Sequence, residues 1–336
     1  MKAVLCKQYG PPETLVVEDI EPPVAGDGQV VMDVHAAAVN FPDVLVIENK
    51  YQFKPPLPFS PGGEVAGVVT AIGDGVKGFA PGDRVMGLCG MGGFREQLAL
   101  PAAACVMMPD ALDFHNGAAM NLTYGTSYHG LKDRANLQPG ETLFVMGASG
   151  GVGLAAVELG KAMGAKVIAA ASTEEKLAVC REHGADETLL YEPGGLTPEQ
   201  QKEFSTTLKE MTGGKGIDVI YDPIGGDYAE PALRAMAWKG RYLVVGFVAG
   251  PIPKIPLNLT LLKGCSIMGV FWGQFTALEP KANAENIAEL LAMLTDGRIK
   301  PRISAVYPLA ETGDALAFMA ARKATGKIII DIGRTS

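Results

Sequence analysis

The chain has 336 residues, of which 48% are hydrophobic and 20% are charged, with a formal net charge of −8 and a pI near 5.2. This length allows two domains and a large core, while the acidic balance disfavours a nucleic-acid partner held by a broad basic surface. The five cysteines are scattered and contain no C-x-x-C pair. They predict neither a disulfide framework nor a four-thiolate zinc site, and they fit a reducing compartment.

The N-terminal stretch from Met1 to Tyr9 has no long apolar region and no small-residue cleavage site. We therefore expect no signal peptide, and no apolar run is long enough to span a membrane. A cytoplasmic location is the default expectation, with import of a longer precursor into an organelle as the alternative.

Residues 1–121 are predicted to be β-rich. Alternating runs at Lys2–Lys7 and Gln29–Ala38 are interrupted by proline and glycine, as at 81–83. Such turn markers and bends are typical of a folded barrel. Residues 110–121 then have a helical pattern.

From about residue 123, apolar strands alternate with helical segments. We expect strands at 142–147, 166–171, 187–191, 217–221, 241–247 and 265–270, and helices at 125–136, 150–164, 173–183, 198–212 and 227–237. This alternation of strands and helices predicts a doubly wound, six-stranded sheet.

The C-terminal part is expected to contain an amphipathic helix at 280–296 and a tail at 301–336 with short strands around a helix at 311–323. The tail most simply rejoins the β-rich region. The predicted domains are therefore a discontinuous one, residues 1–122 with 276–336, and a nucleotide-binding one, residues 123–275.

A glycine-rich turn follows the apolar strand that begins at residue 142. In this strand–helix–strand context Gly150 and Gly151 let the backbone approach a pyrophosphate, and Gly153 lets the helix pack closely. The amides that open the helix hold phosphates. The alternative is a tight structural turn that binds nothing. The candidate cofactor-binding residues of the turn are Gly147, Ala148, Ser149, Gly150, Gly151 and Val152.

The end of the second strand indicates which dinucleotide binds. An NAD site usually has an acidic residue there, whereas this chain has Ala171 and Ser172. Ser172 can donate to a 2′-phosphate and Lys176 can neutralise it, with Arg181 as a second cation, so we predict NADPH. In the structural alternative, Ser172 or Thr173 caps the next helix, and both roles can coexist.

Residues after the carboxyl ends of the other strands are further candidates, because ligands bind there in open α/β sheets. Asp222 ends the fourth strand, where a loop-capping role and a ligand role are equally open. Trp272 and Phe275 could instead be aromatics of a dimer interface. The candidates selected in this way are Tyr191, Gly246, Phe247, Val248, Val270, Phe271 and Trp272.

Several short motifs together carry a resemblance to a known family. The chain resembles the medium-chain dehydrogenase/reductase superfamily, specifically its zinc-free quinone oxidoreductase branch, which includes zeta-crystallin. The resemblance implies a GroES-like, β-rich catalytic domain beside a Rossmann domain. The motifs are Val39-Asn40-Phe41-Pro42-Asp43, Pro61-Gly62-Gly63-Glu64-Val65-Ala66-Gly67, Gly82-Asp83-Arg84-Val85, Gly147 to Gly153, Asp218-Val219-Ile220-Tyr221-Asp222 and Thr325-Gly326-Lys327.

The same comparison predicts that the protein needs no metal. In the zinc alcohol dehydrogenases of the superfamily a Cys stands where Asn40 stands here and a His where Gly63 stands, and neither can replace its counterpart as a ligand. The expected four-Cys lobe is reduced to Cys89 between Gly87 and Phe94. The histidines are dispersed and are expected to be surface, cap or core residues: His35, His115, His129 and His183.

Without a metal, alcohol oxidation lacks its Lewis acid, whereas reduction of an activated double bond needs a hydride, a hydrogen-bond donor and a proton. Asn40 and Tyr51 are the candidate donors. By resemblance, a tyrosine matching Tyr51 takes part in proton donation in the enoyl thioester reductases, and both residues line the nicotinamide pocket in quinone reductases. The alternatives are an exposed loop tyrosine and an asparagine that bonds its own backbone.

The resemblance also implies roles for cofactor contacts. Tyr191 would lie near the adenosine phosphate, while Phe247, Val248 and Phe271 would flank the nicotinamide. Thr126 matches a cofactor-contacting position. Lys327 matches a cofactor-side lysine, with a plain edge-strand lysine as its alternative.

The predicted function is an NADPH-dependent, metal-free reductase of quinones. A reductase of enones, enoyl thioesters or acrylates with the same apparatus, and a cofactor-binding protein with little turnover, remain open. We also expect a homodimer, because strand 265–270 would form an apolar sheet edge that relatives pair across a two-fold axis. The alternative is an edge covered by residues 251–262.

Overall fold

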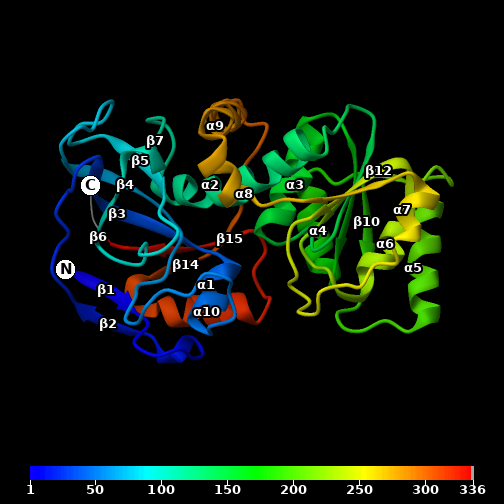
Figure 1. Cartoon of the computed structure of the whole chain (residues 1–336), viewed down its shortest axis with the longest axis horizontal. Coiled ribbons are helices and arrows are strands. Elements are labelled where there is room, and N and C mark those ends of the chain that lie inside the picture. The colour runs from blue at the N-terminus through cyan, green and yellow to red at the C-terminus, as the bar shows by residue number, and fades with distance from the viewer. Residues whose placement is uncertain (334–336) are drawn as a thin grey trace. The chain divides into compact units, whose positions relative to one another are not determined.

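The structure is a computed structural model that describes residues 1–333 of the chain, and these divide into two compact units (Figure 1). One unit combines residues 1–122 with the tail from residue 301, and the other comprises residues 123–300. Within residues 1–333, no helix is both long enough and apolar enough to cross a membrane.

The first unit is built on a seven-stranded sheet of order β14-β15-β3-β4-β5-β7, with β6 also pairing β3. The predicted return of the tail is confirmed, because Ile328 of β15 pairs with Val39 of β3. The strands of this unit are β1 (Lys2–Leu5), β2 (Val16–Asp19), β3 (Gln29–Val39), β4 (Glu64–Ile72), β5 (Arg84–Leu88), β6 (Gln97–Pro101), β7 (Cys105–Met107), β14 (Ile303–Pro308) and β15 (Lys327–Asp331).

Two short helices accompany this sheet, α1 (Phe41–Ile47) and α10 (Thr312–Ala320). The second was predicted at 311–323. The first was not predicted, because a seven-residue segment beginning at Phe41-Pro42 is too short for a helical period to be distinguished from a turn.

The second unit contains a six-stranded parallel sheet of order β10-β9-β8-β11-β12-β13, as predicted for a doubly wound fold. Alternate side chains of its strands face opposite helical layers. Its strands are β8 (Thr142–Val145), β9 (Lys166–Ala171), β10 (Glu187–Leu190), β11 (Ile217–Asp222), β12 (Met236–Val244) and β13 (Ser266–Gly269), and its helices are α3 (Gly151–Ala162), α4 (Glu174–Glu182), α5 (Pro198–Met211), α6 (Ala229–Arg234), α7 (Asn258–Lys263), α8 (Trp272–Leu278) and α9 (Pro280–Thr295).

The two faces of this sheet can be assigned from packing. Phe144 and Ile168 share a buried cluster with Phe204 of α5, so α5 covers their face. On the opposite face, a Cβ added to Gly160 of α3 would lie 2.5 Å from a methyl of Leu143. Helix α3 therefore packs directly on β8.

The junction between the units differs from the prediction. Two helices were expected, at 110–121 and 125–136, but a single helix, α2 (Phe114–Tyr128), passes through the division and continues as a π-helical segment at His129–Arg134. No proline falls between residues 110 and 136, so nothing in the local sequence stops the helix.

The C-terminal domain boundary also differs, since it lies at 300/301 instead of 275/276. Helix α9 is tied to the second unit by side-chain contacts. Lys132 Nζ donates to Asn286 Oδ1 at 2.9 Å and to Glu289 Oε2 at 2.7 Å, and Asn286 Nδ2 donates to Asp133 Oδ2 at 2.7 Å. These contacts join segments about 150 residues apart, which a local sequence pattern does not reveal.

Candidate active site and cofactor-binding turn

The glycine turn lies between β8 and α3, at the carboxyl end of the first strand of the parallel sheet. Gly147 has a φ of +56°, which favours glycine. A Cβ added to Gly153 would lie 2.3 Å from the carbonyl oxygen of Gly147, so the helix could not approach the turn with any other residue there. The predicted packing role of Gly153 is confirmed.

The turn leaves backbone donors at the start of α3. The N–H of Ala148 donates to Ala170 O at 2.9 Å, and that of Gly150 donates to Gly147 O at 3.1 Å. The first amides of the helix, from Gly151 onward, have no intrahelical acceptor. Since Gly150, Gly151 and Val152 are only partly buried, these donors and the positive end of a twelve-residue helix suit a pyrophosphate.

A hydroxyl and an ammonium lie together beyond β9. Lys176 Nζ donates to Ser172 Oγ at 3.3 Å, and Thr173 caps α4 by accepting the N–H of Lys176. Of the two residues considered as the cap, Thr173 is therefore the one that serves. Arg181 is engaged elsewhere, with Thr188 Oγ1 at 2.9 Å and Glu174 Oε2 at 3.4 Å. The donor set of Ser172 and Lys176 fits a phosphate monoester.

Asp222 has the loop-capping role. Its Oδ1 accepts the N–H groups of Ile224 at 2.8 Å and Gly225 at 2.9 Å, and its Oδ2 accepts the hydroxyl of Tyr242. Burial raises the pKa of Asp222. The carboxylate is therefore occupied within the fold, which leaves it no evident ligand role.

The other predicted cofactor contacts of this unit lie on the carboxyl side of the sheet or on α2. Tyr191 stacks edge-on against Tyr228, with ring centroids 5.0 Å apart. Phe271 is 68% exposed, whereas Val270 is 8% exposed. Half-buried or exposed positions are occupied by Thr126, Gly246, Phe247 and Val248.

The proposal that Trp272 and Phe275 are interface aromatics is wrong for this structure. Both are buried within the second unit. Trp272 Nε1 donates to Asn283 Oδ1 at 3.1 Å, and Phe275 stacks on His129 with ring centroids 3.9 Å apart. Their partners come from α9 and the π-helical segment, which is why their burial was not foreseen.

In the first unit, Asn40, Glu64 and Lys327 form a buried polar cluster. Lys327 Nζ lies 2.5 Å from Glu64 Oε1 and 2.6 Å from Asn40 Oδ1, and Asn40 Nδ2 donates to Glu64 Oε1 at 2.9 Å. Asn40 is 5% exposed, Glu64 is 0% exposed and Lys327 is 3% exposed. Buried charges persist when they are paired and hydrogen-bonded, as here.

This cluster corrects two alternatives. Lys327 is not an edge-strand lysine, because β15 lies between β14 and β3. Asn40 does not mainly bond its own backbone: its side chain contacts the carbonyl of Ala38 at 3.3 Å and takes part in the capping box of α1 with Asp43, but its shorter bonds go to Lys327 and Glu64. Its amide hydrogens are nonetheless directed to Glu64 and Ala38, so its side chain is held rigidly within the cluster.

Asp43 and Tyr51 adjoin the cluster. Asp43 Oδ2 accepts the N–H of Asn40 at 2.7 Å and its Oδ1 accepts that of Gly62 at 3.2 Å, while burial raises its pKa to about 7. Tyr51 is half-buried and packs against the core, so it is not an exposed loop residue. Burial and the neighbouring charge of Asp43 raise the pKa of Tyr51, which keeps its hydroxyl protonated.

Sequence reasoning assigned no role to Asp43 or Glu64. A usable signal existed for Glu64, because a carboxylate at the start of the apolar run Val65-Ala66 must find a partner if that strand is buried. Its partner is Lys327, 263 positions away, together with the N–H of Leu122 at 2.8 Å. That pairing is a tertiary property.

The donor chemistry near Asn40 is unsuited to zinc. Among residues 1–333, no group of three or more His, Cys, Asp and Glu side chains is arranged to hold a metal ion. The thiol of Cys89 donates to Gly62 O at 3.3 Å, and burial raises its pKa. A thiol that retains its proton is a poor ligand.

Comparison with known proteins places these features in a family. The family model described as "Alcohol dehydrogenase GroES-like domain" matches residues 26–110, and the model described as "Zinc-binding dehydrogenase" matches residues 151–293. A quinone oxidoreductase-like protein 2 homolog of Nematostella vectensis is 42% identical over 98% of this chain and 88% of its own length. The chain belongs to the medium-chain dehydrogenase/reductase superfamily, in its quinone oxidoreductase branch.

Two further relatives support this assignment. The human quinone oxidoreductase is 35% identical, with coverage of 98% of this chain and 97% of that protein. The crystal structure of Escherichia coli quinone oxidoreductase complexed with NADPH has a TM-score of 0.90 at 26% identity, covering 98% of this chain and all of that one. This member of the superfamily is therefore an oxidoreductase, with a GroES-like and a Rossmann-type unit as expected.

Proposed function

We propose that this enzyme is an NADPH-dependent, metal-free reductase of quinones. The observation that carries the proposal is the Lys176–Ser172 pair beyond β9, which stands where an NAD enzyme has a carboxylate. The Escherichia coli relative that is complexed with NADPH supports the same choice. Both observations concern the cofactor, so the substrate needs its own test.

The residues of the second unit would hold the cofactor. The first amides of α3, from Gly151, would bind the pyrophosphate, while Lys176 and Ser172 would bind the 2′-phosphate. Gly153 keeps the helix close enough to the turn for this. NADPH, when bound, supplies a hydride for an electrophilic carbon. The protein's part is to bind, orient and exclude water.

In the first unit we assign hydrogen-bond donation to Tyr51 and positioning to Asn40. Reduction of a quinone places negative charge on a carbonyl oxygen, and a protonated phenol can donate to it. The raised pKa of Tyr51 keeps that phenol protonated at neutral pH. Asn40 has its amide hydrogens committed to Glu64 and Ala38, so it would orient neighbouring groups and line the pocket.

Metal independence is part of the proposal. Two residues stand where the alcohol dehydrogenases have zinc ligands. Asn40 offers an amide that is held by Lys327, and Gly63 has no side chain. Turnover should survive prolonged chelation, and elemental analysis should find less than one zinc per chain. A tightly bound zinc required for turnover would overturn this part.

The decisive experiment compares 9,10-phenanthrenequinone with crotonyl and acryloyl thioesters, each with NADPH and with NADH. Faster turnover of the quinone with NADPH supports the proposal. Faster reduction of a thioester would reassign the enzyme to the enoyl reductases of the family. NADPH binding without turnover of any substrate would indicate a crystallin-like role.

All five cysteines are free, which suits a cytoplasmic location that cell fractionation can test.

A further inference from the structure

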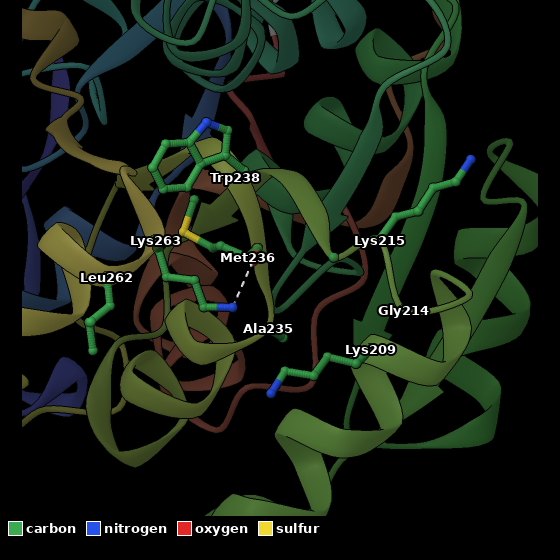
Figure 2. Close-up of a pocket in the computed structure, with 9 residues that line it drawn as sticks. Lys209, Gly214, Lys215, Ala235, Met236, Trp238, Leu262 and Lys263 are labelled. Atoms are coloured by element: carbon green, nitrogen blue, oxygen red, sulfur yellow. Dashed lines mark hydrogen bonds between the residues drawn. The ribbon is translucent and has the colours of Figure 1, made fainter.

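A second concave site lies at the opposite end of the parallel sheet from the glycine turn. It is formed where the chain leads into β11, β12 and β13, with a volume of about 260 Å³ (Figure 2). Its lining residues are Lys209, Gly214, Lys215, Gly216, Ala235, Met236, Trp238, Leu262 and Lys263. Because the strands are parallel, their amino ends all lie at one end of the sheet, and the cofactor turn lies at the opposite end, where the carboxyl ends are.

Two ammonium groups face this pocket. In Figure 2, Lys209 and Lys263 point toward the same space near Ala235, whereas Lys215 extends away from it. Lys263 Nζ donates to the carbonyl of Met236 at 3.1 Å. In residues 1–333, no carboxylate lies within 4.0 Å of the Nζ of any of these three lysines.

These lysines lie together in a chain whose net charge is −8. Burial and the positive charge of Lys209 both lower the pKa of Lys263. Two like charges that share a pocket without a carboxylate repel each other, and a bound anion would remove that repulsion. The charge pattern therefore favours a ligand with at least two negative charges.

An exposed aromatic surface adjoins the charges. Trp238 is 68% exposed and Leu262 is 69% exposed. The indole is backed by Gly264, which has a φ of +57° and where an added Cβ would lie 2.8 Å from the ring. The fold thus holds the six-membered ring of the indole against the backbone beside Lys263. A flat ring can stack on an indole supported in this way.

We propose that this pocket binds a small phosphate monoester that carries a flat ring. Its phosphate would lie between Lys209 and Lys263, and its ring would contact Trp238. A phosphate carries close to two negative charges at neutral pH and matches two lysine point charges better than a single carboxylate does. The site is separate from the proposed 2′-phosphate site, because β11 alone spans about 20 Å between its amino end and its carboxyl end.

The test uses the fluorescence of Trp238 and phenyl phosphate as the probe. The chain has two tryptophans, and the other, Trp272, is 5% exposed. Binding is measured in a Trp272→Phe background and, in parallel, by calorimetry on the unaltered protein. Phenyl phosphate should bind at least about fivefold tighter than inorganic phosphate, because stacking on the indole adds to the ionic contacts.

Variants locate the site. Lys209→Gln and Lys263→Gln should each weaken phenyl phosphate binding about tenfold, as expected for loss of one charged contact. Lys215→Gln is the matched control, since this lysine lines the same pocket but its ammonium points away, and it should change the affinity less than twofold. Lys176→Met should leave this binding unchanged, which separates the pocket from the cofactor site.

Four outcomes would overturn the inference. Equal affinities of the Lys209, Lys263 and Lys215 variants for phenyl phosphate would exclude a built anion site. The same would follow if sodium chloride at equal ionic strength produced the same fluorescence change as phenyl phosphate. Loss of binding in Lys176→Met would place the probe in the cofactor site. Equal affinities for phenyl phosphate and inorganic phosphate would eliminate the ring contact with Trp238.

Discussion

At the scale of the residue, surroundings give two lysines different roles. Lys327 is buried against Glu64 and Asn40, where truncating it would leave a carboxylate without its counter-charge. Lys176 lies at the start of α4 beside the hydroxyl of Ser172. The first lysine supports the fold of its unit, while we propose that the second binds the 2′-phosphate.

Replacing Lys176 should therefore change cofactor choice. Lys176→Met should raise the Michaelis constant for NADPH by about 10- to 100-fold, which corresponds to ~1.5–3 kcal/mol for one charged contact, and leave that for NADH nearly unchanged. Steady-state kinetics with both cofactors measures this. Arg181→Met is the control, because that guanidinium is held by Thr188 and Glu174, and it should have little effect. Equal losses with both cofactors would reject the assignment.

Asp43 should make stability depend on pH. Its pKa is raised from 3.8 to about 7 by burial, so the native state keeps a proton that the unfolded chain releases. The unfolded state then binds fewer protons between these values, and stability contributed by the protonated form is lost as pH rises toward 7.

The variant Asp43→Asn removes this titration. Relative to this variant, the wild type should lose about 2–3 kcal/mol of unfolding free energy between pH 5 and pH 7, at about 1.4 kcal/mol per pH unit, and little more above pH 7, where the carboxyl group is ionised in both states. Urea unfolding at several pH values measures both proteins. Parallel stability curves for the two would show that the carboxyl group does not hold a proton in the folded state.

At the scale of the element, the close contact of α3 with the glycine turn is the most demanding geometry of the second unit. A Cβ at Gly153 would lie 2.3 Å from Gly147 O and 2.8 Å from the Cα of Ala148. Both atoms belong to the backbone, so the helix itself must shift. Moving α3 would also move the amides that we assign to the pyrophosphate.

Gly153→Ala should lower the unfolding free energy by about 1–3 kcal/mol, the usual cost of overpacking, and weaken NADPH binding. The matched control is Gly273→Ala in α8, where the nearest atom to an added Cβ is 3.9 Å away. That substitution should be neutral or stabilise slightly, because alanine favours helix. Unfolding midpoints and cofactor titrations compare them. Similar behaviour of the two variants would contradict the packing argument.

At the scale of the whole molecule, β13 has the features of an assembly edge. It pairs with β12 on one side and is the last strand of its sheet. Ile267 is 39% exposed, and Leu257 and Leu261 nearby in sequence are 76% and 80% exposed. Ile252 and Ile255 line a pocket with Ile267 but leave it exposed, so residues 251–262 do not cover the edge fully.

We expect a homodimer through this edge. Light scattering at micromolar concentration should give about twice the chain mass of 35.2 kDa, and Ile267→Glu should shift it toward monomer. Val270 is unsuitable for this test, because at 8% exposure a charge there would disturb the core. Val306→Glu, at a 47% exposed residue of edge strand β14, controls for a charge on a strand edge. A wild-type monomer would refute the expectation.

The linear sequence determined most of the second unit. Six apolar strands separated by helices dictate a doubly wound sheet, and the glycines between 147 and 153 locate the turn that we assign to the pyrophosphate, because both signals are local. The replacement of the usual acidic residue at the end of β9 by Ser172 could also be predicted from neighbouring positions. The return of the tail to the first region followed from its short strands.

Only the tertiary structure decided which polar groups meet. Lys327 joins Asn40 and Glu64 across more than 260 positions, and α9 remains with the second unit through Lys132. Periodicity cannot report such contacts, since they depend on which strand ends and helix faces come together after folding. The burial of Trp272 and the convergence of Lys209 with Lys263 have the same origin: each is set by packing between segments that the sequence separates.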